Sequence, residues 1–531
     1  MVASVSADQP VVSGLTVPEF LIRSAEVWPD RQWVRTPAGS ASRAQVLDRT
    51  RRVAGGLLAA GVSPGDPVVL AMPNSVHFLA PWFAAMFVRA PVLAINPRAA
   101  AAELAAVTAG LEPRLIVAAD SDVAGLTSAL REGPRPAVRV LGIGQLEQAA
   151  AADPLGADPS EHVAFLQTSG STGMPKFIIR THLMYTLAAE AFPWWLGLVD
   201  ADVMLTALPL AHGNAQLYSL LGSLGLGAGL ALLPSFSATT FWTDCVSYRA
   251  TQFNAVGAML EILMQRDPAP ADREHRVRLC YTAPAPGRER HVAIEERFGI
   301  HLVLGYSQSE AGGFGLVMPL QGAPRYGSMG RPRQHPRLGT VTAARVADEH
   351  GNELGENVVG ELEIRNPTAT PGYLGLPAES AALLRDGWLR TGDLAWKDED
   401  GFYYFGGRSK ELIRHKGENL SPAEVERVLE ENPGVAVAAV IGVPSELTEE
   451  DVKAFVLPKA GAQVSAADLF HWCAGRLPPY KCPRYLELVS DLPTTENHKV
   501  AKTRLPRERT ATEADAAVVM VGAAPKGDEG E

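Results

Sequence analysis

The sequence predicts an α/β protein with a large N-terminal domain of layered α/β subdomains, a β-rich subdomain and a small α+β C-terminal domain. Its 531 residues exceed the size that a single hydrophobic core normally supports, so two or more domains are expected. Short apolar runs of about four to eight residues alternate with helix-like segments, which is typical of parallel sheets covered by helices. From residue 340 onward, short strands separated by glycine-containing turns replace this pattern.

The elements expected in the first domain follow from these apolar runs. Residues 67–72 are predicted to form a buried strand, residues 76–88 a helix and residues 91–95 the next strand. Proline and arginine interrupt the apolar stretch that ends at residue 95, so it fits a buried helix and strand better than a membrane span. Later strands are expected at residues 163–167, 204–208, 229–233, 251–256, 278–282 and 302–306.

Changes in composition predict the domain boundaries. An N-terminal domain is expected over residues 1–409 and a C-terminal domain over residues 410–505. The first helix of the C-terminal domain should begin at Ser421, because the run Ser-Pro-Ala-Glu supplies an N-cap, a proline at N1 and a carboxylate at N3. The charged, alanine-rich segment 506–531 is expected to be a disordered tail.

Composition and charge argue against several classes of function. The formal net charge is −11 and the pI is about 5.6, so the chain lacks the basic excess of a nucleic-acid-binding protein. The sequence has no apolar run of about eighteen residues, and its N-terminus has no basic segment followed by an apolar core. We therefore expect a cytoplasmic protein with neither nucleic acid nor membrane as a partner.

Residues 168–176 carry the strongest chemical signal. They follow a predicted strand and read Thr-Ser-Gly-Ser-Thr-Gly-Met-Pro-Lys. Glycines permit turns in which backbone N–H groups converge on an anion, and hydroxyls and an ammonium add donors. A Ser/Gly-rich surface loop is the alternative for this segment alone. A Walker A loop is excluded, because the dipeptide Gly-Lys occurs nowhere in the chain. The expected phosphate-binding residues are Thr168, Ser169, Gly170, Ser171, Thr172, Gly173 and Lys176.

This loop resembles the phosphate-binding signature of the acyl-adenylate-forming enzymes, which include acyl- and aryl-CoA synthetases, luciferases and peptide-synthetase adenylation domains. Segments resembling other motifs of that family follow in the same order, at residues 208–214, 305–310, 388–394, 407–419 and 492–499. The runs 417–421 and 234–242 are most similar to those of carnitine/crotonobetaine-CoA ligases. The resemblance implies ATP-dependent activation of a carboxylic acid to acyl-AMP, with pyrophosphate release, followed by thioester formation with coenzyme A.

The resemblance also implies a role for several single residues. Glu310 would hold Mg²⁺, which bridges and neutralises phosphate oxygens, and Ser309 would contact the phosphates. His212 would lie near the acyl carboxylate. An aromatic face can stack on adenine and a carboxylate can accept both ribose hydroxyls. The residues expected around adenine and ribose are Ala283, Pro284, Tyr306, Asp393 and Arg408.

Lys499 is the expected catalytic cation. Attack of a carboxylate on the α-phosphate brings two anions together, and a preorganised ammonium stabilises the negative charge of the transition state. The resemblance implies that the C-terminal domain is mobile and rotates at a hinge, Lys410. This rotation would exchange Lys499 for a loop that lines the coenzyme A tunnel and contains Lys416, Gly417 and Glu418.

The acyl pocket is expected near Asn214, Phe253 and Gly257. No aspartate follows the histidine of the 208–214 motif, so an amino acid is a poor candidate for the substrate. Small residues such as Gly257 would leave room for a bulky apolar acid.

Two positions depart from the family pattern. His498 stands directly before the expected catalytic lysine, and Phe177 stands directly after Lys176, where glycine is usual in both cases. The first departure keeps open the possibility of a catalytically impaired nucleotide-binding homologue. A second alternative is a stand-alone adenylation enzyme that makes acyl-AMP only or loads a carrier protein. The expected partners are therefore a carboxylic acid, ATP and either coenzyme A or a carrier protein. The protein itself is expected to be a monomer or a homodimer.

Overall fold

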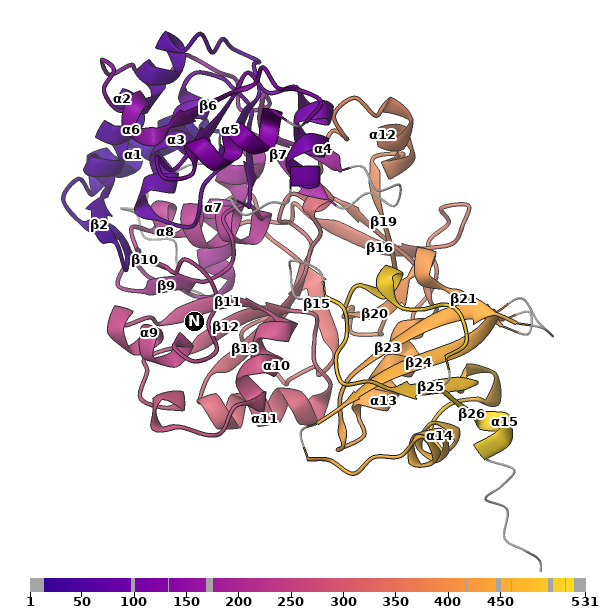
Figure 1. Ribbon diagram of the computed structural model, residues 1–531. Coiled ribbons are helices and arrows are strands. Elements are labelled where there is room, and N and C mark those ends of the chain that lie inside the picture. Colours follow the sequence, from indigo (N-terminus) through magenta and orange to yellow (C-terminus); the bar gives the residue numbers. More distant parts are fainter. Residues whose placement is uncertain are drawn as a thin grey trace, which may run out of the picture. The chain divides into compact units, whose positions relative to one another are not determined.

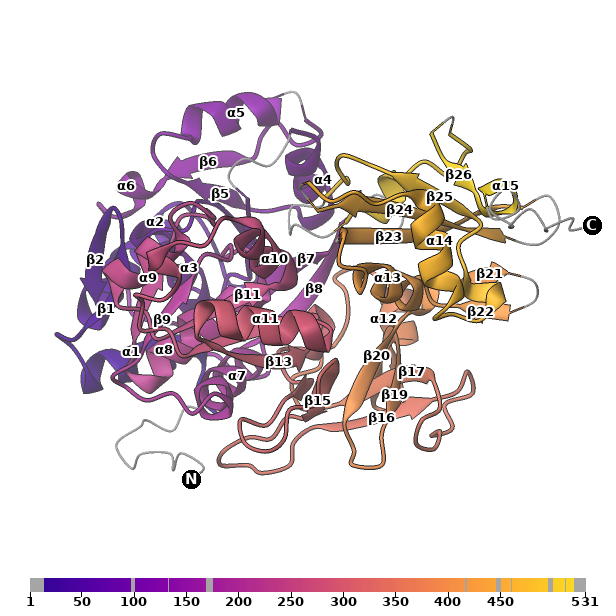
Figure 2. The same ribbon diagram turned by 90° about the horizontal axis from the view of Figure 1, so that it is seen from below.

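The computed structural model of the protein describes residues 14–96, 101–131, 133–168, 175–415, 418–445, 450–459, 461–494, 500–510 and 512–519. The chain divides into two compact units. The first contains residues 1–344 and 363–390, and the second contains residues 345–362 and 391–531. Figures 1 and 2 show two views of the ribbon, in which the chain is coloured from indigo to yellow.

The first unit contains a six-stranded sheet in the order β6-β5-β3-β4-β7-β8. All neighbouring strands are parallel except the pair β7 and β8. Every residue of the inner strands β3, β4 and β5 is buried, as is the middle of the fourth inner strand, β7, which explains their apolar sequences. The bounds are β3 Val68–Ala71, β4 Val92–Ile95, β5 Leu115–Ala118, β6 Arg139–Gly142, β7 His162–Thr168 and β8 Lys176–Thr181.

A second set of strands in the first unit follows the order β15-β14-β13-β12-β11-β9-β10-β1-β2. The strands from β13 to β1 are parallel, and antiparallel pairs flank them at both ends. The bounds are β1 Gln32–Thr36, β2 Gly39–Ser42, β9 Val203–Thr206, β10 Gly229–Leu232, β11 Gln252–Val256, β12 Leu279–Ala283, β13 His301–Tyr306, β14 Leu316–Val317 and β15 Ser328–Pro332.

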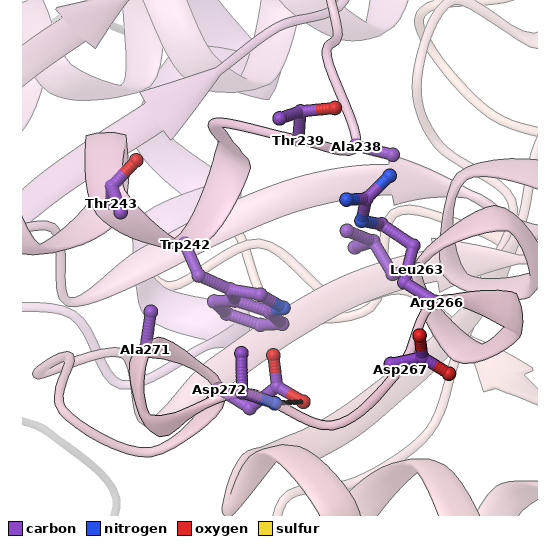
Figure 3. Close-up of a pocket in the computed structure, with 10 residues that line it drawn as sticks. Ala238, Thr239, Trp242, Thr243, Leu263, Arg266, Asp267, Ala271 and Asp272 are labelled. Atoms are coloured by element: carbon purple, nitrogen blue, oxygen red, sulfur yellow. Dashed lines mark hydrogen bonds between the residues drawn. The ribbon is translucent and has the colours of Figure 1, made fainter.

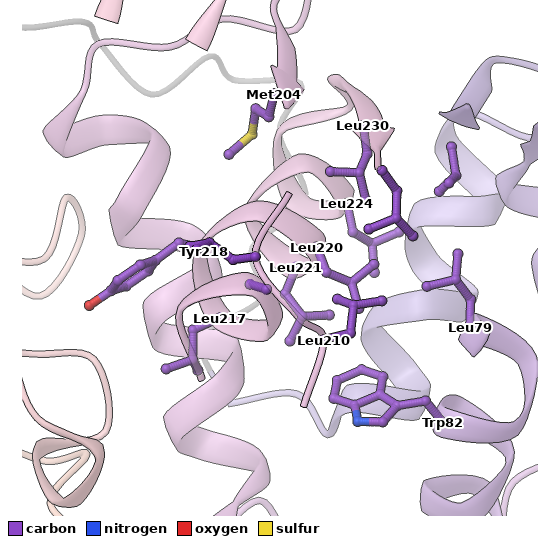
Figure 4. Close-up of a cluster of buried hydrophobic side chains, with 14 of the residues drawn as sticks. Leu79, Trp82, Met204, Leu210, Leu217, Tyr218, Leu220, Leu221, Leu224 and Leu230 are labelled. Carbon is purple, nitrogen blue, oxygen red and sulfur yellow. The ribbon is translucent and has the colours of Figure 1, made fainter. Parts of the chain in front are cut away.

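Helices of the first unit enclose one large hydrophobic core. Helix α3 is almost completely buried, and its Leu79 and Trp82 lie in the same cluster as leucines of η1 and α8 (Figure 4). The helix bounds are α1 Val17–Val27, α2 Arg43–Ala59, α3 Val76–Phe87, α4 Ala101–Leu111, α5 Val123–Arg131, α6 Ile143–Leu146, α7 His182–Trp195, η1 Ala215–Leu220, α8 Leu221–Leu226, α9 Phe241–Tyr248, α10 Gly257–Gln265, η2 Pro270–Asp272, α11 Arg288–Phe298, η3 Ser309–Ala311 and α12 Pro377–Leu383. Within the described ranges, no helix has the length and apolar character needed to cross a bilayer.

Short strands surround the boundary between the two units in the sequence. Strands β19 and β20 form an antiparallel pair, and β21 and β22 form a second one. The bounds are β16 Ala343–Ala347, β17 Gly360–Arg365, β18 Leu384–Arg385, β19 Trp388–Lys397, β20 Tyr403–Arg408, η4 Ser409–Glu411, β21 Ile413–His415 and β22 Glu418–Leu420.

The second unit also contains a four-stranded sheet in the order β23-β24-β25-β26, against which α13 and α14 bury apolar residues. Helix α13 begins at Pro422 with Ser421 as the N-cap, as predicted, but the serine side chain makes no capping hydrogen bond. The bounds are α13 Pro422–Glu430, β23 Val435–Pro444, β24 Glu450–Pro458, α14 Ala466–Ala474, η5 Pro479–Lys481, β25 Tyr485–Leu488, η6 Lys502–Arg504, β26 Ala514–Asp515 and α15 Ala516–Val519.

The prediction of a disordered tail from residue 506 is wrong for the described part of that segment. Strand β26 pairs with β25, and the buried Glu513 forms an ion pair of 2.7 Å with the buried Lys453. Arg509 binds the same carboxylate at 2.8 Å. A buried lysine is costly without a paired carboxylate. The ion pair with Lys453 therefore favours an ordered conformation around Glu513, in a segment whose composition alone suggested disorder.

Candidate active site

The strands β7 and β8 form the stem of the predicted phosphate loop. Thr168 ends β7 and is the register partner of Lys176, the first residue of β8. The predicted phosphate ligands between them, Ser169, Gly170, Ser171, Thr172 and Gly173, lie outside the described residues. The antiparallel pairing therefore sets Thr168 and Lys176 side by side at the two ends of the loop.

Phe177 fits this stem without displacing the lysine. Its side chain is buried, and its ring lies 2.9 Å from the position that a Cβ atom on Gly110 would occupy. The Phe177 ring thus fits here because Gly110 of α4 has no side chain. Because side chains alternate along a strand, Lys176, Ile178 and Arg180 share the opposite face of β8.

Tyr373 connects the phosphate-loop stem to Glu310. The segment that contains Tyr373 forms a β-bridge with Ile178 of β8. The Lys176 ammonium lies 5.1 Å from the centre of the Tyr373 ring, and the tyrosine hydroxyl donates a hydrogen bond of 2.9 Å to Glu310 Oε1. Burial raises the pKa of Tyr373, and the Glu310 carboxylate adds to this effect, so the hydroxyl remains a donor at neutral pH.

Sequence reasoning missed Tyr373. The available signal was an aromatic residue directly after the Pro371–Gly372 turn, but nothing in the sequence shows that this turn lies beside β8. The backbone hydrogen bond from Leu374 to Phe177 (2.9 Å) establishes that neighbourhood.

Glu310 fits the role of a magnesium ligand. It lies in η3, and its backbone carbonyl accepts a hydrogen bond of 2.7 Å from the Thr370 amide. Tyr373 occupies Oε1, and no described residue donates a hydrogen bond to Oε2. The described part of the chain has no group of three metal-binding side chains. A single carboxylate nevertheless suits Mg²⁺, which usually takes its remaining ligands from substrate phosphates and water.

The residues predicted around adenine lie at the carboxyl ends of neighbouring parallel strands. Ala283 ends β12 and Tyr306 ends β13, and these two strands pair directly. Pro284 follows β12, and Ser309 begins η3 shortly after β13. The carboxyl edge of a parallel sheet is the usual place for a nucleotide. Along the chain, Tyr306 lies four residues before Glu310 and Ser309 directly precedes it.

The residues predicted for the ribose pair with each other in the second unit. Asp393 and Arg408 are register partners across β19 and β20, and Arg408 Nε lies 3.3 Å from Asp393 Oδ1. The Asp393 side chain is 7% exposed and that of Arg408 is 59% exposed. A guanidinium therefore orients the carboxylate while its own remaining donors stay accessible.

His212 and Asn214 are half-buried: His212 lies in the connection after β9, and Asn214 is the helical residue directly before η1. The Asn214 side-chain oxygen accepts a hydrogen bond of 2.8 Å from Asn254 Nδ2, and Asn254 also contacts Ser219 (3.3 Å) and Gln252 (2.6 Å). Asn214 therefore lies at the end of a buried polar network that reaches it from β11.

The other two pocket candidates are placed differently from expectation. Phe253 is fully buried and its ring packs edge-on against Phe241 and Trp242, on the face of β11 opposite Asn254. At Gly257, a Cβ atom would lie 3.2 Å from Pro284 Cδ, so that proline fills the space expected for substrate. Neither position supports an apolar pocket.

The residues directly before and after the predicted hinge residue each make a side-chain contact. Ser409 donates a hydrogen bond of 2.9 Å to the Gly392 carbonyl, whereas Glu411 pairs with Lys502 at 2.9 Å. Lys502 also pairs with the half-buried Glu426 of α13 at 2.7 Å. Lys410, between these two anchors, is exposed.

The expected catalytic lysine lies outside the described residues, but its flanks are described. Thr494 and Val500 form an antiparallel bridge, and Ala501 donates a backbone hydrogen bond of 2.7 Å to Pro493. Lys499 and its neighbour His498 fall between these bridged residues. Lys416 and Gly417 of the predicted tunnel loop also lie outside the described residues, and Glu418 begins β22.

A separate pocket of about 100 Å³ lies next to α9 and α10 (Figure 3). Trp242, Arg266 and Asp272 are among the residues that line it, and none of the predicted site residues do. Asp272 is already paired with Arg297 at 2.9 Å, which gives this carboxylate a structural role.

The chain matches the AMP-binding enzyme family over residues 21–374 and the AMP-binding enzyme C-terminal domain over residues 424–499. It is 30% identical to an oxalate–CoA ligase of Arabidopsis thaliana over 93% of this chain and 98% of that protein. It is also 30% identical to a crotonobetaine/carnitine–CoA ligase of Escherichia coli, over 84% of this chain and 89% of that protein. A benzoate CoA ligase from Burkholderia xenovorans has the same fold, with a TM-score of 0.83, 25% identity and coverage of 93% of this chain and 100% of that one.

The fold, the ordered motifs and these matches define the class of the protein: the chain belongs to the AMP-binding enzyme family. Within that family it is an enzyme of the acid–thiol ligase class, like the relatives just described.

Proposed function

We propose that the protein joins a carboxylic acid to coenzyme A in two steps, using ATP. In the first step a carboxylate oxygen attacks the α-phosphorus of ATP, the bond from that phosphorus to the bridging oxygen breaks, and pyrophosphate leaves. In the second step the coenzyme A sulfur, after losing its proton, attacks the acyl carbon, and the carbon–oxygen bond to AMP breaks. The CoA ligases among the relatives support this reaction class.

The single observation that carries this proposal is the linked set Lys176, Tyr373 and Glu310. It combines an ammonium at the stem of a glycine- and hydroxyl-rich loop with a carboxylate whose second oxygen accepts no hydrogen bond from a described residue. Mg²⁺ bound to that oxygen would neutralise phosphate charge. Lys176 would bind phosphate oxygens, and Tyr373 would hold the Glu310 carboxylate in one orientation through its hydrogen bond.

The other proposed roles follow the sequence predictions. Tyr306 would stack on adenine, Asp393 would accept the ribose hydroxyls, and His212 would lie near the acyl carboxylate. Lys499 would stabilise the charge that develops on the α-phosphate. The 416–418 loop would take the place of Lys499 for the thioester step.

The identity of the acid does not follow from the relatives. Their names give oxalate, crotonobetaine or carnitine, and benzoate, which differ widely in chemistry. The expectation of a bulky apolar acid rested on small residues such as Gly257, where a Cβ atom would lie only 3.2 Å from Pro284 Cδ. We therefore do not carry that expectation into the proposed function.

A screen of acids with two acceptors tests this function. Purified protein is incubated with Mg-ATP, a panel of fatty, aryl, terpenoid and dicarboxylic acids, and either coenzyme A or a phosphopantetheinyl carrier protein. We expect pyrophosphate release and an acyl-CoA product. A thioester found only on the carrier would indicate an adenylation enzyme, and the absence of pyrophosphate release with every acid would indicate an impaired nucleotide-binding homologue.

We expect the substitution Lys410→Pro to slow one half-reaction at least about tenfold more than the other. Proline fixes φ and removes a backbone donor, so it restricts the change in backbone dihedrals that a hinge must make. Pyrophosphate release and conversion of preformed acyl-AMP to thioester are measured separately. Lys410→Ala removes the same side chain but keeps the backbone freedom, and it should affect both steps less. Equal losses in the two steps of the proline variant would argue against a hinge at this residue.

A further inference from the structure

Arg180 is a buried arginine whose side chain makes no hydrogen bond with a described residue. It lies on β8, on the same face as Lys176, and is only 1% exposed. Its Nε and Nη1 atoms have no hydrogen-bond partner, and no carboxylate of the described residues lies within ion-pair distance of its guanidinium. An isolated buried charge is costly, so such a group normally has a partner.

The other two fully buried arginines of the described residues both make side-chain hydrogen bonds, although Arg43 Nη1 has no partner. Arg333 donates to the carbonyls of Leu316 and Gly313 and to the hydroxyls of Tyr218 and Tyr281. Arg43 donates to the Ser24 hydroxyl (3.1 Å) and to the carbonyls of Ser223 (3.0 Å) and Ala228 (2.9 Å). Among these three arginines, Arg180 is therefore the one whose side chain makes no hydrogen bond with a described residue.

That place is directly beneath the loop between β9 and η1. A Cβ atom on Gly213 would lie 3.3 Å from Arg180 Nη2, so glycine allows the guanidinium to reach the loop backbone. The loop residues His212, Gly213 and Asn214 are only half-buried. A small anion entering at this loop would meet the guanidinium immediately below it.

The side chains beside the loop are polar as well. The Asn214 oxygen is occupied by Asn254, which leaves the Asn214 amide nitrogen to donate toward a ligand. Buried Asn254, Gln252 and Ser219 continue this network below it. Such a surface suits a charged or hydrogen-bonding group and disfavours an alkyl chain.

We propose that the acid activated by this protein carries a second anionic group, and that Arg180 binds that group. This inference rests on the proposed acid-activating function. Arg180 follows Lys176 by four positions on one strand, about 13 Å of backbone at 3.3 Å per residue. The bound anion would thus be the distal end of a short dicarboxylic or sulfonic acid whose other carboxylate reacts. The planar guanidinium can bind either group through two parallel hydrogen bonds.

Matched pairs of acids test this assignment. Malonate, succinate and glutarate are compared with propionate, butyrate and valerate, in which a methyl group replaces one carboxylate. We expect the wild-type protein to prefer one or more of the diacids by about 10- to 100-fold in kcat/KM for pyrophosphate release, the range typical of a lost charge-assisted hydrogen bond. Arg180→Leu should abolish the preference by losing activity with diacids alone, and Arg180→Lys should restore part of it. No preference in the wild type, or an equal loss for both kinds of acid, would overturn the proposal.

Thermal unfolding provides a readout that does not depend on activity. Burial lowers the pKa of Arg180 and only part of this is offset by Glu310, which lies beyond ion-pair distance. Arg180→Leu should therefore unfold at the same temperature as the wild type or higher. The preferred diacid should raise the unfolding midpoint of the wild type but not that of Arg180→Leu. Arg333→Leu is the matched control, and it should lower the midpoint because it removes the hydrogen bonds of Arg333 to two hydroxyls and two carbonyls.

The two experiments separate failure of the inference from failure of the proposed function. If no acid supports pyrophosphate release but a diacid stabilises only the wild type, the binding site stands and the reaction is wrong. If no diacid shifts the midpoint, or if Arg180→Leu unfolds well below the wild type, Arg180 is structural and the inference is wrong.

Discussion

Replacing Lys499 with alanine should lower the rate of pyrophosphate release by about 10²- to 10³-fold while ATP binding is retained. The proposed role of the ammonium is to stabilise charge that appears only in the transition state, and loss of one such electrostatic group typically costs about 3–4 kcal/mol. Single-turnover pyrophosphate release measures the first effect, and equilibrium binding of ATP measures the second.

Lys459→Ala is a suitable control for this experiment. Lys459 is also a lysine of the second unit, but its ammonium donates to the Pro433 carbonyl at 2.7 Å and holds a turn. This control should release pyrophosphate at the wild-type rate. A near-normal rate in Lys499→Ala would refute the catalytic role of Lys499 and strengthen the reading of the chain as a protein that departs from its family at His498.

Replacing Glu310 with glutamine should lower the rate of the adenylation step by about 10²-fold or more and raise the Mg²⁺ concentration needed for half-maximal rate. The amide is nearly isosteric and can still accept the Tyr373 hydrogen bond, but it lacks the charge that favours Mg²⁺. The measurement is pyrophosphate release as a function of Mg²⁺ concentration at saturating ATP.

Tyr373→Phe separates the carboxylate from its hydrogen bond. This variant keeps the charge of Glu310 and loses only the donor, so its effect should be smaller than that of Glu310→Gln and should leave the Mg²⁺ dependence closer to the wild type. An unchanged Mg²⁺ dependence in Glu310→Gln would exclude this residue as the metal ligand.

The fold could be predicted from the sequence where burial alone decides the structure. The strand and helix expected at residues 67–72 and 76–88 correspond to β3 and α3 within one or two residues, because both are apolar over their whole length. Gly227 ends α8 in the left-handed conformation, which glycine adopts most readily.

Features that depend on long-range contacts could not be predicted. Phe177 is an anomaly in the sequence, and only the fold shows that Gly110 makes room for its ring. Phe253 was expected at the acyl pocket. Because side chains alternate along β11, Phe253 instead packs in the aromatic core and Asn254 faces Asn214. Tyr373 and Arg180 gain their significance from residues more than thirty positions away.

The anchors around Lys410 constrain how the C-terminal part could turn. Glu411 is tied through Lys502 to α13 and to the base of the segment that carries Lys499, whereas Ser409 is tied to Gly392. A rotation at Lys410 would therefore move Glu411, α13 and the segment that carries Lys499 together, as one rigid body. If that assembly rotates as a rigid body, the backbone dihedral angles of Lys410 alone would determine where Lys499 is placed after each rotation.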